Sequence, residues 1–362
     1  MPSSRCGTCG VSLIEMLVAI AIATATCSVL FHFAAADQRM ARAQSEAADL
    51  QQRIRVAADM IQRDLIMAGA GLAHGSDAGP LVNYLPPIVP ARTGARNPDP
   101  ELTYFDDRVS IVFVHGGAPS APLAADMPDA NAAVPIDPGA PGCPSAGLCG
   151  FAKGTRTLLV DESGAGAGFE LFSVTDASSD LAHGSPDAPF SRPYSTATGR
   201  AFAVTQHVYY LDRSNKRLML YDGYQSDVPL VENVVDLKFS YYIDPSSTSA
   251  PQPPAGTGNC VYTPGTPPTP LLIEFGGTLL RQASSSQFTD GPVCGIAPHR
   301  FDGDLLRLRK VRVTLRAQVG ANDFRGTGVD FMQAGISRGG ESSVPDLEVT
   351  FDVTPRNMRP TR

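Results

Sequence analysis

Residues that could carry catalysis are thinly spread along this chain of 362 residues. The stretch Gly335 to Gly339 reads G-x-S-x-G, a pattern that presents a nucleophilic serine when a strand precedes it and a helix follows it. The residues from Gly340 to Pro345 are unsuited to starting a helix. The six histidines are scattered without metal-ligand spacing: His32, His74, His115, His183, His207 and His299. The sequence therefore favours a protein that is not an enzyme.

Two short acidic stretches raise the question of a metal site. These are Asp106-Asp107 and Asp302-Gly303-Asp304. A calcium site takes six or more oxygen ligands, and no single loop in this sequence supplies that number. We interpret these carboxylates as solvated loop acids, and we expect no metal and no cofactor.

The seven cysteines fall into three groups. Cys6 and Cys9 form a C-x-x-C pair, but no second pair or histidine partner accompanies them. Cys27 lies in an apolar run, where a thiol behaves as a small apolar group. The remaining four lie in loop-like sequence: Cys143, Cys149, Cys260 and Cys294. In an oxidising compartment an even number indicates disulfides. Of the three possible pairings, Cys143–Cys149 with Cys260–Cys294 closes the shortest loops, and we expect it.

Composition limits the class of protein. The apolar fraction of 43% is enough for a sizeable core. The net charge of −7 argues against a nucleic-acid partner bound by broad basic surface. The 34 Gly and 31 Pro predict long loops. Four Pro/Gly/Ser-rich stretches fit that prediction: residues 116–150, 176–199, 244–270 and 281–298.

An apolar run near the amino terminus predicts a membrane-spanning helix. Residues 11–36 carry one formal charge, Glu15. About 20 apolar residues are enough to cross the hydrocarbon core of a bilayer as a helix. A secretory signal peptide is the main rival interpretation, because small residues that suit cleavage follow at Ala34 to Ala36.

The next segment, residues 37–68, predicts that the same helix continues as an amphipathic one. Its apolar residues recur every three or four positions, at Met40, Ala43, Ala47, Leu50, Ile54, Ala57, Ile61 and Leu65. No Pro or Gly interrupts the chain from Val11 to Ala68, and Gly69 and Gly71 then provide a stop signal. A single helix of this length is about 87 Å long.

The rest of the chain predicts an antiparallel β-rich body. Strand-like runs occupy residues 109–114, 157–160, 169–174, 305–319 and 347–353. Residues 201–212 and 216–221 are expected to form a hairpin around Ser214-Asn215. Strands that follow one helix indicate an α+β fold, in which the amphipathic half of the helix covers one face of an antiparallel sheet.

The residues around the start of the apolar run resemble the type IV prepilin signature. The stretch from Cys9 to Val18 places Gly at the end of a short leader and Glu at the fifth position after it. The resemblance implies that a prepilin peptidase cuts after Gly10, that the new amino terminus at Val11 is methylated, and that Glu15 serves filament assembly. Two features differ from the usual pattern: the first mature residue is Val rather than Phe, and the leader has one basic residue, Arg5.

Further stretches resemble minor pilins of the PilW type and the related J-type pseudopilins of type II secretion. They are residues 62–69, 207–212, 217–221, 230–241, 309–316 and 354–357. This resemblance implies a type IV pilin-like fold: a long amino-terminal helix, half transmembrane and half amphipathic, packed on an antiparallel sheet domain with long loops.

The resemblance also implies an organisation and a function. Residues 1–10 would be the leader, 11–36 the transmembrane half of the helix, 37–68 its amphipathic half, and 69–362 a periplasmic domain. The expected protein is a non-enzymatic minor pilin at or near the tip of a type IV pilus. It would be held in the inner membrane by one helix before entering the pilus at the cell surface. Its partners would be other minor and major pilins, the prepilin peptidase and the inner-membrane assembly platform. The alternatives are a type II secretion pseudopilin at its pseudopilus tip and an envelope enzyme anchored by one helix.

Overall fold

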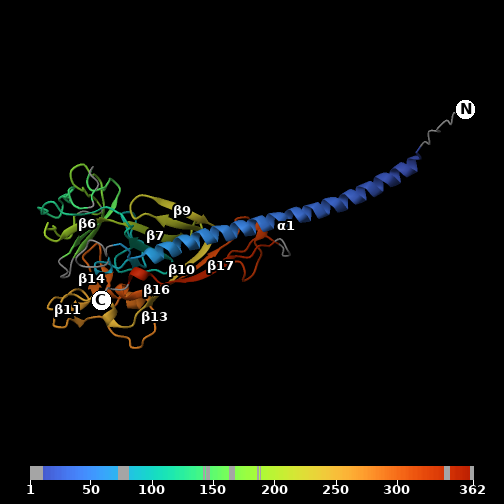
Figure 1. The fold of residues 1–362 in the computed structure, drawn as a ribbon. Coiled ribbons are helices and arrows are strands. Elements are labelled where there is room, and N and C mark those ends of the chain that lie inside the picture. Colours follow the sequence, from blue (N-terminus) through green and yellow to red (C-terminus); the bar gives the residue numbers. More distant parts are fainter. Residues whose placement is uncertain are drawn as a thin grey trace, which may run out of the picture. The chain divides into compact units, whose positions relative to one another are not determined.

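One long helix opens the described chain, as the sequence predicts. The computed structural model describes residues 11–71, 81–141, 143, 147–162, 168–185, 187, 189–337 and 343–358. Helix α1 spans Leu13–Met67 and is drawn in blue in Figure 1. Gly69 then adopts a φ of 75°. A Cβ at this position would lie 3.0 Å from both the Asn357 carbonyl oxygen and the Pro87 ring. The helix therefore ends where the backbone requires a glycine.

The two halves of α1 have different surroundings. It is the helix of the described chain that is long and apolar enough to cross a membrane, and none of its most apolar 18-residue stretch is buried. From Ala43 onward the predicted apolar face is the buried one, with Ala43, Leu50, Ile54, Ala57, Ile61 and Leu65 each at most 5% exposed. Met40 is 39% exposed, so burial begins one turn later than the sequence pattern.

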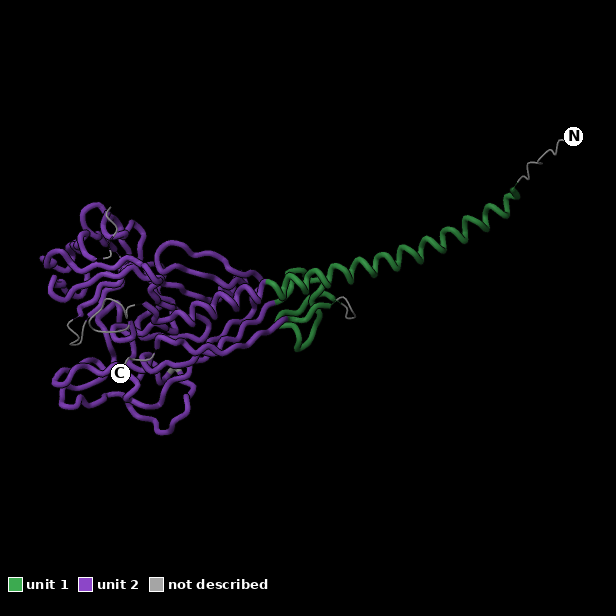
Figure 2. Tube along the Cα trace, viewed as in Figure 1, with its two compact units in different colours: residues 1–52, 318–346 green, residues 53–317, 347–362 purple. Residues whose placement is uncertain are grey.

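The chain groups into two compact units, which Figure 2 colours separately. Unit 1 comprises residues 1–52 and 318–346, and unit 2 comprises residues 53–317 and 347–362. In the described part of unit 1, residues 318–346 form no strand and fold on themselves through backbone hydrogen bonds. For example, the Val344 N–H donates to the Phe324 carbonyl at 2.8 Å.

Unit 2 holds the β-structure, and all of its strand pairs are antiparallel, which gives the predicted α+β fold. A five-stranded sheet has the order β1-β2-β7-β8-β9, formed by Ile88–Val89, Arg108–Phe113, Thr205–Asp212, Arg217–Tyr221 and Asp227–Glu232. A four-stranded sheet has the order β13-β10-β16-β17, formed by Arg281–Gln282, Val234–Ile243, Leu308–Ala317 and Leu347–Val353. A second four-stranded sheet has the order β3-β6-β4-β5, formed by Ser120–Pro122, Gly199–Ala203, Arg156–Asp161 and Phe169–Ser173.

Smaller elements complete the described chain. Two short strand pairs are β11-β12 (Tyr262–Thr263 and Thr269–Pro270) and β14-β15 (Val293–Cys294 and Phe301–Asp302). Short 3-10 helices span Leu81–Asn83, Ser247–Ser249, Ser285–Phe288, Gly303–Arg307, Asn322–Phe324 and Arg356–Met358.

The carboxyl-terminal part of α1 packs on the five-stranded sheet of unit 2. The chain leaving the helix pairs with β2, because the Gly69 N–H donates to the Val112 carbonyl at 3.0 Å and the Val114 N–H donates to the Ala70 carbonyl at 2.9 Å. Earlier in the helix, Arg53 Nη1 donates to the Glu232 carbonyl of β9 at 3.2 Å. The end of the helix therefore lies at β2 and Arg53 at β9, the edge strand on the other side of the sheet.

One predicted strand is wrong in extent. The sequence predicts a single strand over residues 201–212, but the structure divides it at Val204 into β6 and β7, which belong to different sheets. Val204 is buried, and its N–H donates to the Arg156 carbonyl of β4 at 2.8 Å. A strand that changes sheets keeps its apolar alternation, so periodicity does not reveal the break. The hairpin around Ser214-Asn215 is confirmed by the pairing of β7 with β8.

Candidate functional site

The residues predicted to direct processing and assembly lie at the start of α1. Gly10, the predicted cleavage position, lies outside the described residues. Val11 is 73% exposed, and Glu15 is exposed in the first turn of the helix. The first turn carries unpaired N–H groups and the positive end of the helix dipole. The one acid of the apolar segment therefore lies where a helix best accommodates a negative charge.

The hydroxyl side chains within the apolar half of α1 are satisfied by the helix itself. The hydroxyls of Thr24, Thr26 and Ser28 donate to backbone carbonyls three or four residues earlier, at 2.8 to 3.0 Å. Hydroxyls bonded in this way need no partner outside the helix. The exposed surface of this half is therefore compatible with lipid or with neighbouring apolar helices.

A buried acid joins α1 to the sheet. Asp64 is 8% exposed, and its Oδ2 lies 2.6 Å from both His207 Nδ1 and the Tyr209 hydroxyl of β7. Burial and the nearby Asp64 carboxylate raise the pKa of Tyr209, so the phenol keeps its proton and donates it. This group was not predicted from the sequence. Its signal was an acid placed on the apolar face, between Ile61 and Leu65.

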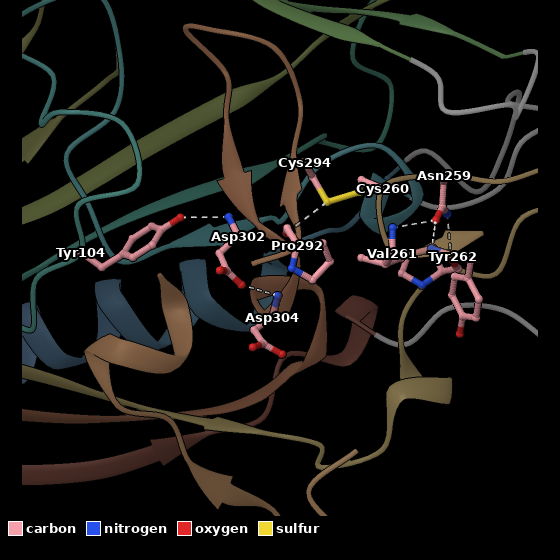
Figure 3. Close-up of a disulfide and its surroundings, with 10 residues drawn as sticks. Tyr104, Asn259, Cys260, Val261, Tyr262, Pro292, Cys294, Asp302 and Asp304 are labelled. Carbon is pink, nitrogen blue, oxygen red and sulfur yellow. Dashed lines mark hydrogen bonds between the residues drawn. A yellow bond between two sulfur atoms is a disulfide. The ribbon is translucent and has the colours of Figure 1, made fainter. Parts of the chain in front are cut away.

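Four cysteines form two disulfides in the local pairing expected from the sequence. Cys143 and Cys149 have a Cα–Cα distance of 4.5 Å, and Cys260 and Cys294 one of 5.2 Å. Figure 3 shows the second bridge, which joins Cys260, just before β11, to β14. It closes the larger of the two loops, with a sequence separation of 34 residues against 6.

Beside this disulfide, two predicted solvated acids prove to be buried, and Asp107 elsewhere in unit 2 is also buried, which corrects the sequence interpretation. Asp302 is 0% and Asp304 2% exposed. The two oxygens of Asp302 accept the N–H groups of Asp304 at 2.8 Å and Gly291 at 2.7 Å, and its own N–H donates to the Tyr104 hydroxyl (Figure 3). Asp304 pairs with Arg307 at 2.6 Å. Segments distant in sequence bury these acids, so local composition cannot reveal their burial.

The contacts of these acids indicate a structural role in holding the loop together, and not a metal site. A third carboxylate, Asp290, has an oxygen within 4.8 Å of oxygens from Asp302 and Asp304. Burial is the main cause that raises the pKa of Asp304 to about 6, partly offset by the Arg307 charge. Because Asp302 and Asp304 already accept hydrogen bonds from this chain, the group is assigned a structural role.

The G-x-S-x-G stretch does not have the environment that a nucleophile requires. Its described part, Gly335 to Ser337, lies in a loop, where the Gly335 N–H donates to the Gly326 carbonyl at 2.9 Å. No strand directly precedes it among the described residues. Arg338 and Gly339 lie outside the described residues.

Comparison of the chain with protein-family models, with curated proteins and with solved structures gave no match. The class of protein therefore follows from the features described above. A long apolar amino-terminal helix that continues onto antiparallel sheets is consistent with a pilin-like fold. One membrane-capable helix together with two disulfides is typical of an envelope protein with an extracytoplasmic domain.

Proposed function

We propose that the protein is a minor pilin that takes part in type IV pilus assembly, at or near the pilus tip. The supporting observation is helix α1, whose first half is apolar and unburied while its carboxyl-terminal part packs on a sheet. An inner-membrane subunit awaiting assembly needs both properties. Its apolar half stays in lipid until it meets other subunits, and its carboxyl-terminal end is attached to the folded body.

Glu15 provides the chemistry of assembly in this proposal. Its position is four residues after Val11, about 6 Å along the helix axis. An isolated carboxylate in lipid is unfavourable by a few kcal/mol, and a cation nearby offsets that energy. After cleavage, the amino group at Val11 of a neighbouring subunit would supply the cation. The attraction is strongest where water is excluded, which favours the assembled helix bundle over the free subunit.

Substitution at Glu15 tests the proposal. We expect Glu15→Ala and Glu15→Gln to insert and to be cleaved normally, but to enter pili about tenfold less well, corresponding to a loss of ~1.4 kcal/mol. The measurement is quantitative immunoblotting of sheared pili against whole cells. Ser12→Ala, a polar-to-small change one turn away, is the matched control and should incorporate like the wild type.

Wild-type incorporation of both Glu15 variants would overturn the pairing of Glu15 with a neighbouring amine. It would mean either that Glu15 is an incidental interfacial residue or that the protein caps the filament with no subunit above it, and cross-linking from Val11 would distinguish the two. Normal piliation of a deletion strain with failed protein secretion would instead favour the pseudopilin alternative.

A further inference from the structure

Unit 2 contains a pocket that the pilus proposal does not use. Its volume is about 420 Å³, within the usual range for small-molecule sites. It lies between β1 and β2 on one side and β5 and the segment before β15 on the other. Most of its wall is apolar, formed by Leu85, Val89, Val112, Phe169, Leu171 and Phe301.

An arginine with spare hydrogen-bond donors lines this apolar pocket. Arg156 is only 7% exposed. Its Nε donates to Gln206 at 3.0 Å, and its Nη1 donates to Ser173 and to Asp187, both at 3.1 Å. Nη2 has no partner among the residues that the structure describes. The guanidinium is therefore fixed in place by three bonds and keeps two N–H groups for a ligand.

A histidine beside it provides a second donor. Burial, with a smaller effect of the Arg156 charge, lowers the pKa of His299 to about 4, so the ring is neutral at pH 7. Its Nε2 faces two groups, the Leu171 N–H at 3.5 Å and a carboxyl oxygen of the buried Glu170 at 3.6 Å. Nδ1 has no partner within the described chain, and a ligand carboxylate there would select the tautomer that carries the ring proton on Nδ1.

The three carboxylates that line the pocket are already engaged by other groups. Asp187 is held by the ion pair with Arg156. Asp99 lies 2.9 Å from Arg108, and Glu101 lies 3.9 Å from Arg300. Arg156 Nη2 and His299 Nδ1 are thus available to a ligand, and Arg156 also carries a positive charge.

We propose that this pocket binds a small organic carboxylate with a flat apolar body. The carboxylate would accept from Arg156 Nη2 and His299 Nδ1, because a hydrogen bond between charged groups is stronger than one between neutral groups. The body would lie against Phe169 and Phe301, whose ring centroids are 6.3 Å apart. This site does not depend on the pilus assignment, since it uses only groups within unit 2.

Binding of a fluorinated probe tests the site. The probe is para-fluorophenylacetate, with its uncharged amide as the matched ligand, followed by fluorine NMR on the full chain in detergent micelles. We expect the acid to bind at least about tenfold more tightly than the amide, a difference of ~1.4 kcal/mol. Comparable affinities for acid and amide, or no binding of either, would overturn the proposal.

Two variants locate the bound probe. Ala91 lines the pocket and is 5% exposed, so Ala91→Leu fills part of the volume while both donor residues stay unchanged. It should abolish binding, whereas Ala152→Leu, at an exposed position outside the pocket lining, should not. Retention of binding by Ala91→Leu would place the probe elsewhere and refute the site. If Ala91→Leu does not fold, His299→Phe keeps a ring but removes one donor, and it must reduce the affinity for the acid toward that for the amide.

Discussion

Glu15 and Asp64 are two acids on one helix with opposite surroundings. Glu15 is exposed in the first helical turn, within a segment that has no other formal charge before residue 37. Asp64 is buried, and two donors from β7 satisfy one of its oxygens. An acid without an internal partner is available to bind another molecule, whereas an acid already paired stabilises its own fold. Asp64 therefore contributes to packing at one end of α1, whereas Glu15 at the other end is free for the assembly role that we propose.

At the residue scale, the first prediction concerns Gly10. We expect Gly10→Val to leave an uncleaved precursor, because a side chain at the position before the cut should block the peptidase. Amino-terminal sequencing would show a start at Val11 in the wild type and at residue 1 or 2 in the variant. Gly7→Val adds the same bulk elsewhere in the leader and should be cleaved normally. A mature start near Asp37 would instead indicate ordinary secretion and exclude the pilin proposal.

A second prediction at this scale concerns the pH dependence contributed by His299. Its folded pKa of about 4 lies below the usual value of 6.5, so between these values the unfolded chain binds a proton that the folded chain does not. The stabilisation is therefore complete above pH 6.5 and is lost as the pH falls toward 4. We expect the wild type to lose about 2 kcal/mol through this group between pH 7 and pH 4.5.

The measurement compares chemical denaturation of the wild type and His299→Phe at the two pH values. Phenylalanine does not titrate, so the unfolding free energy of the variant should fall less on acidification. Groups that do not contact His299 contribute equally to both chains and cancel, so the difference reports His299 together with Glu170, whose carboxyl oxygen lies 3.6 Å from its Nε2. Identical pH slopes for the two proteins would mean that His299 is protonated equally in the folded and unfolded states.

At the scale of elements, Asp64 is predicted to hold α1 against the five-stranded sheet. Asp64→Ala leaves the Tyr209 hydroxyl and His207 Nδ1 without their acceptor in a buried site. The expected cost is about 2 kcal/mol of unfolding free energy. Urea denaturation measures it, with Asp59→Ala as the control, because Asp59 is exposed on the same helix. A loss no larger than that of the control would show that apolar packing alone fixes the helix.

Elements with a regular sequence pattern could be predicted, because periodicity directly reports which face is buried. The buried residues from Ala43 to Leu65 follow the predicted helical face, and β16 alternates buried and half-buried residues as a half-buried strand should. The break at Val204 was not predictable, since β6 and β7 have compatible patterns on either side of it.

Contacts between distant segments could not be predicted from local sequence. Asp302 and Asp304 looked like loop acids, yet their burial depends on Tyr104 and on the loop at Gly291. The pocket joins Arg156 to His299 across 143 positions of sequence, and neither residue stands in a motif. Such groups of residues can be identified only in the folded structure, where the distant segments come into contact.

At the scale of the whole molecule, the long loops of unit 2 are held in place by a few buried hydrogen bonds, ion pairs and disulfides. Arg307 is fully buried and donates to the carbonyls of Asp244, Pro245 and Ile273 at 2.6 to 3.0 Å. Its pairing with Asp304 connects this network to the loop that contains Cys294. Gly- and Pro-rich segments lose much conformational entropy on ordering, so such fixed points must offset a substantial unfavourable free energy.

The last prediction compares the two disulfides as such fixed points. In the chain-entropy model, a bridge over about 7 residues stabilises by roughly 2 kcal/mol and one over about 35 residues by roughly 4 kcal/mol. We therefore expect the Cys260→Ser/Cys294→Ser double variant to lose more unfolding free energy than the Cys143→Ser/Cys149→Ser double variant. Replacing both cysteines of a bridge leaves no free thiol to form a wrong pair. Denaturation under oxidising conditions measures both losses, and peptide mapping without reduction verifies the pairing in the parent chain. An equal or reversed order would mean that the Arg307 network already orders residues 260–294, so that the larger loop is restrained without its disulfide.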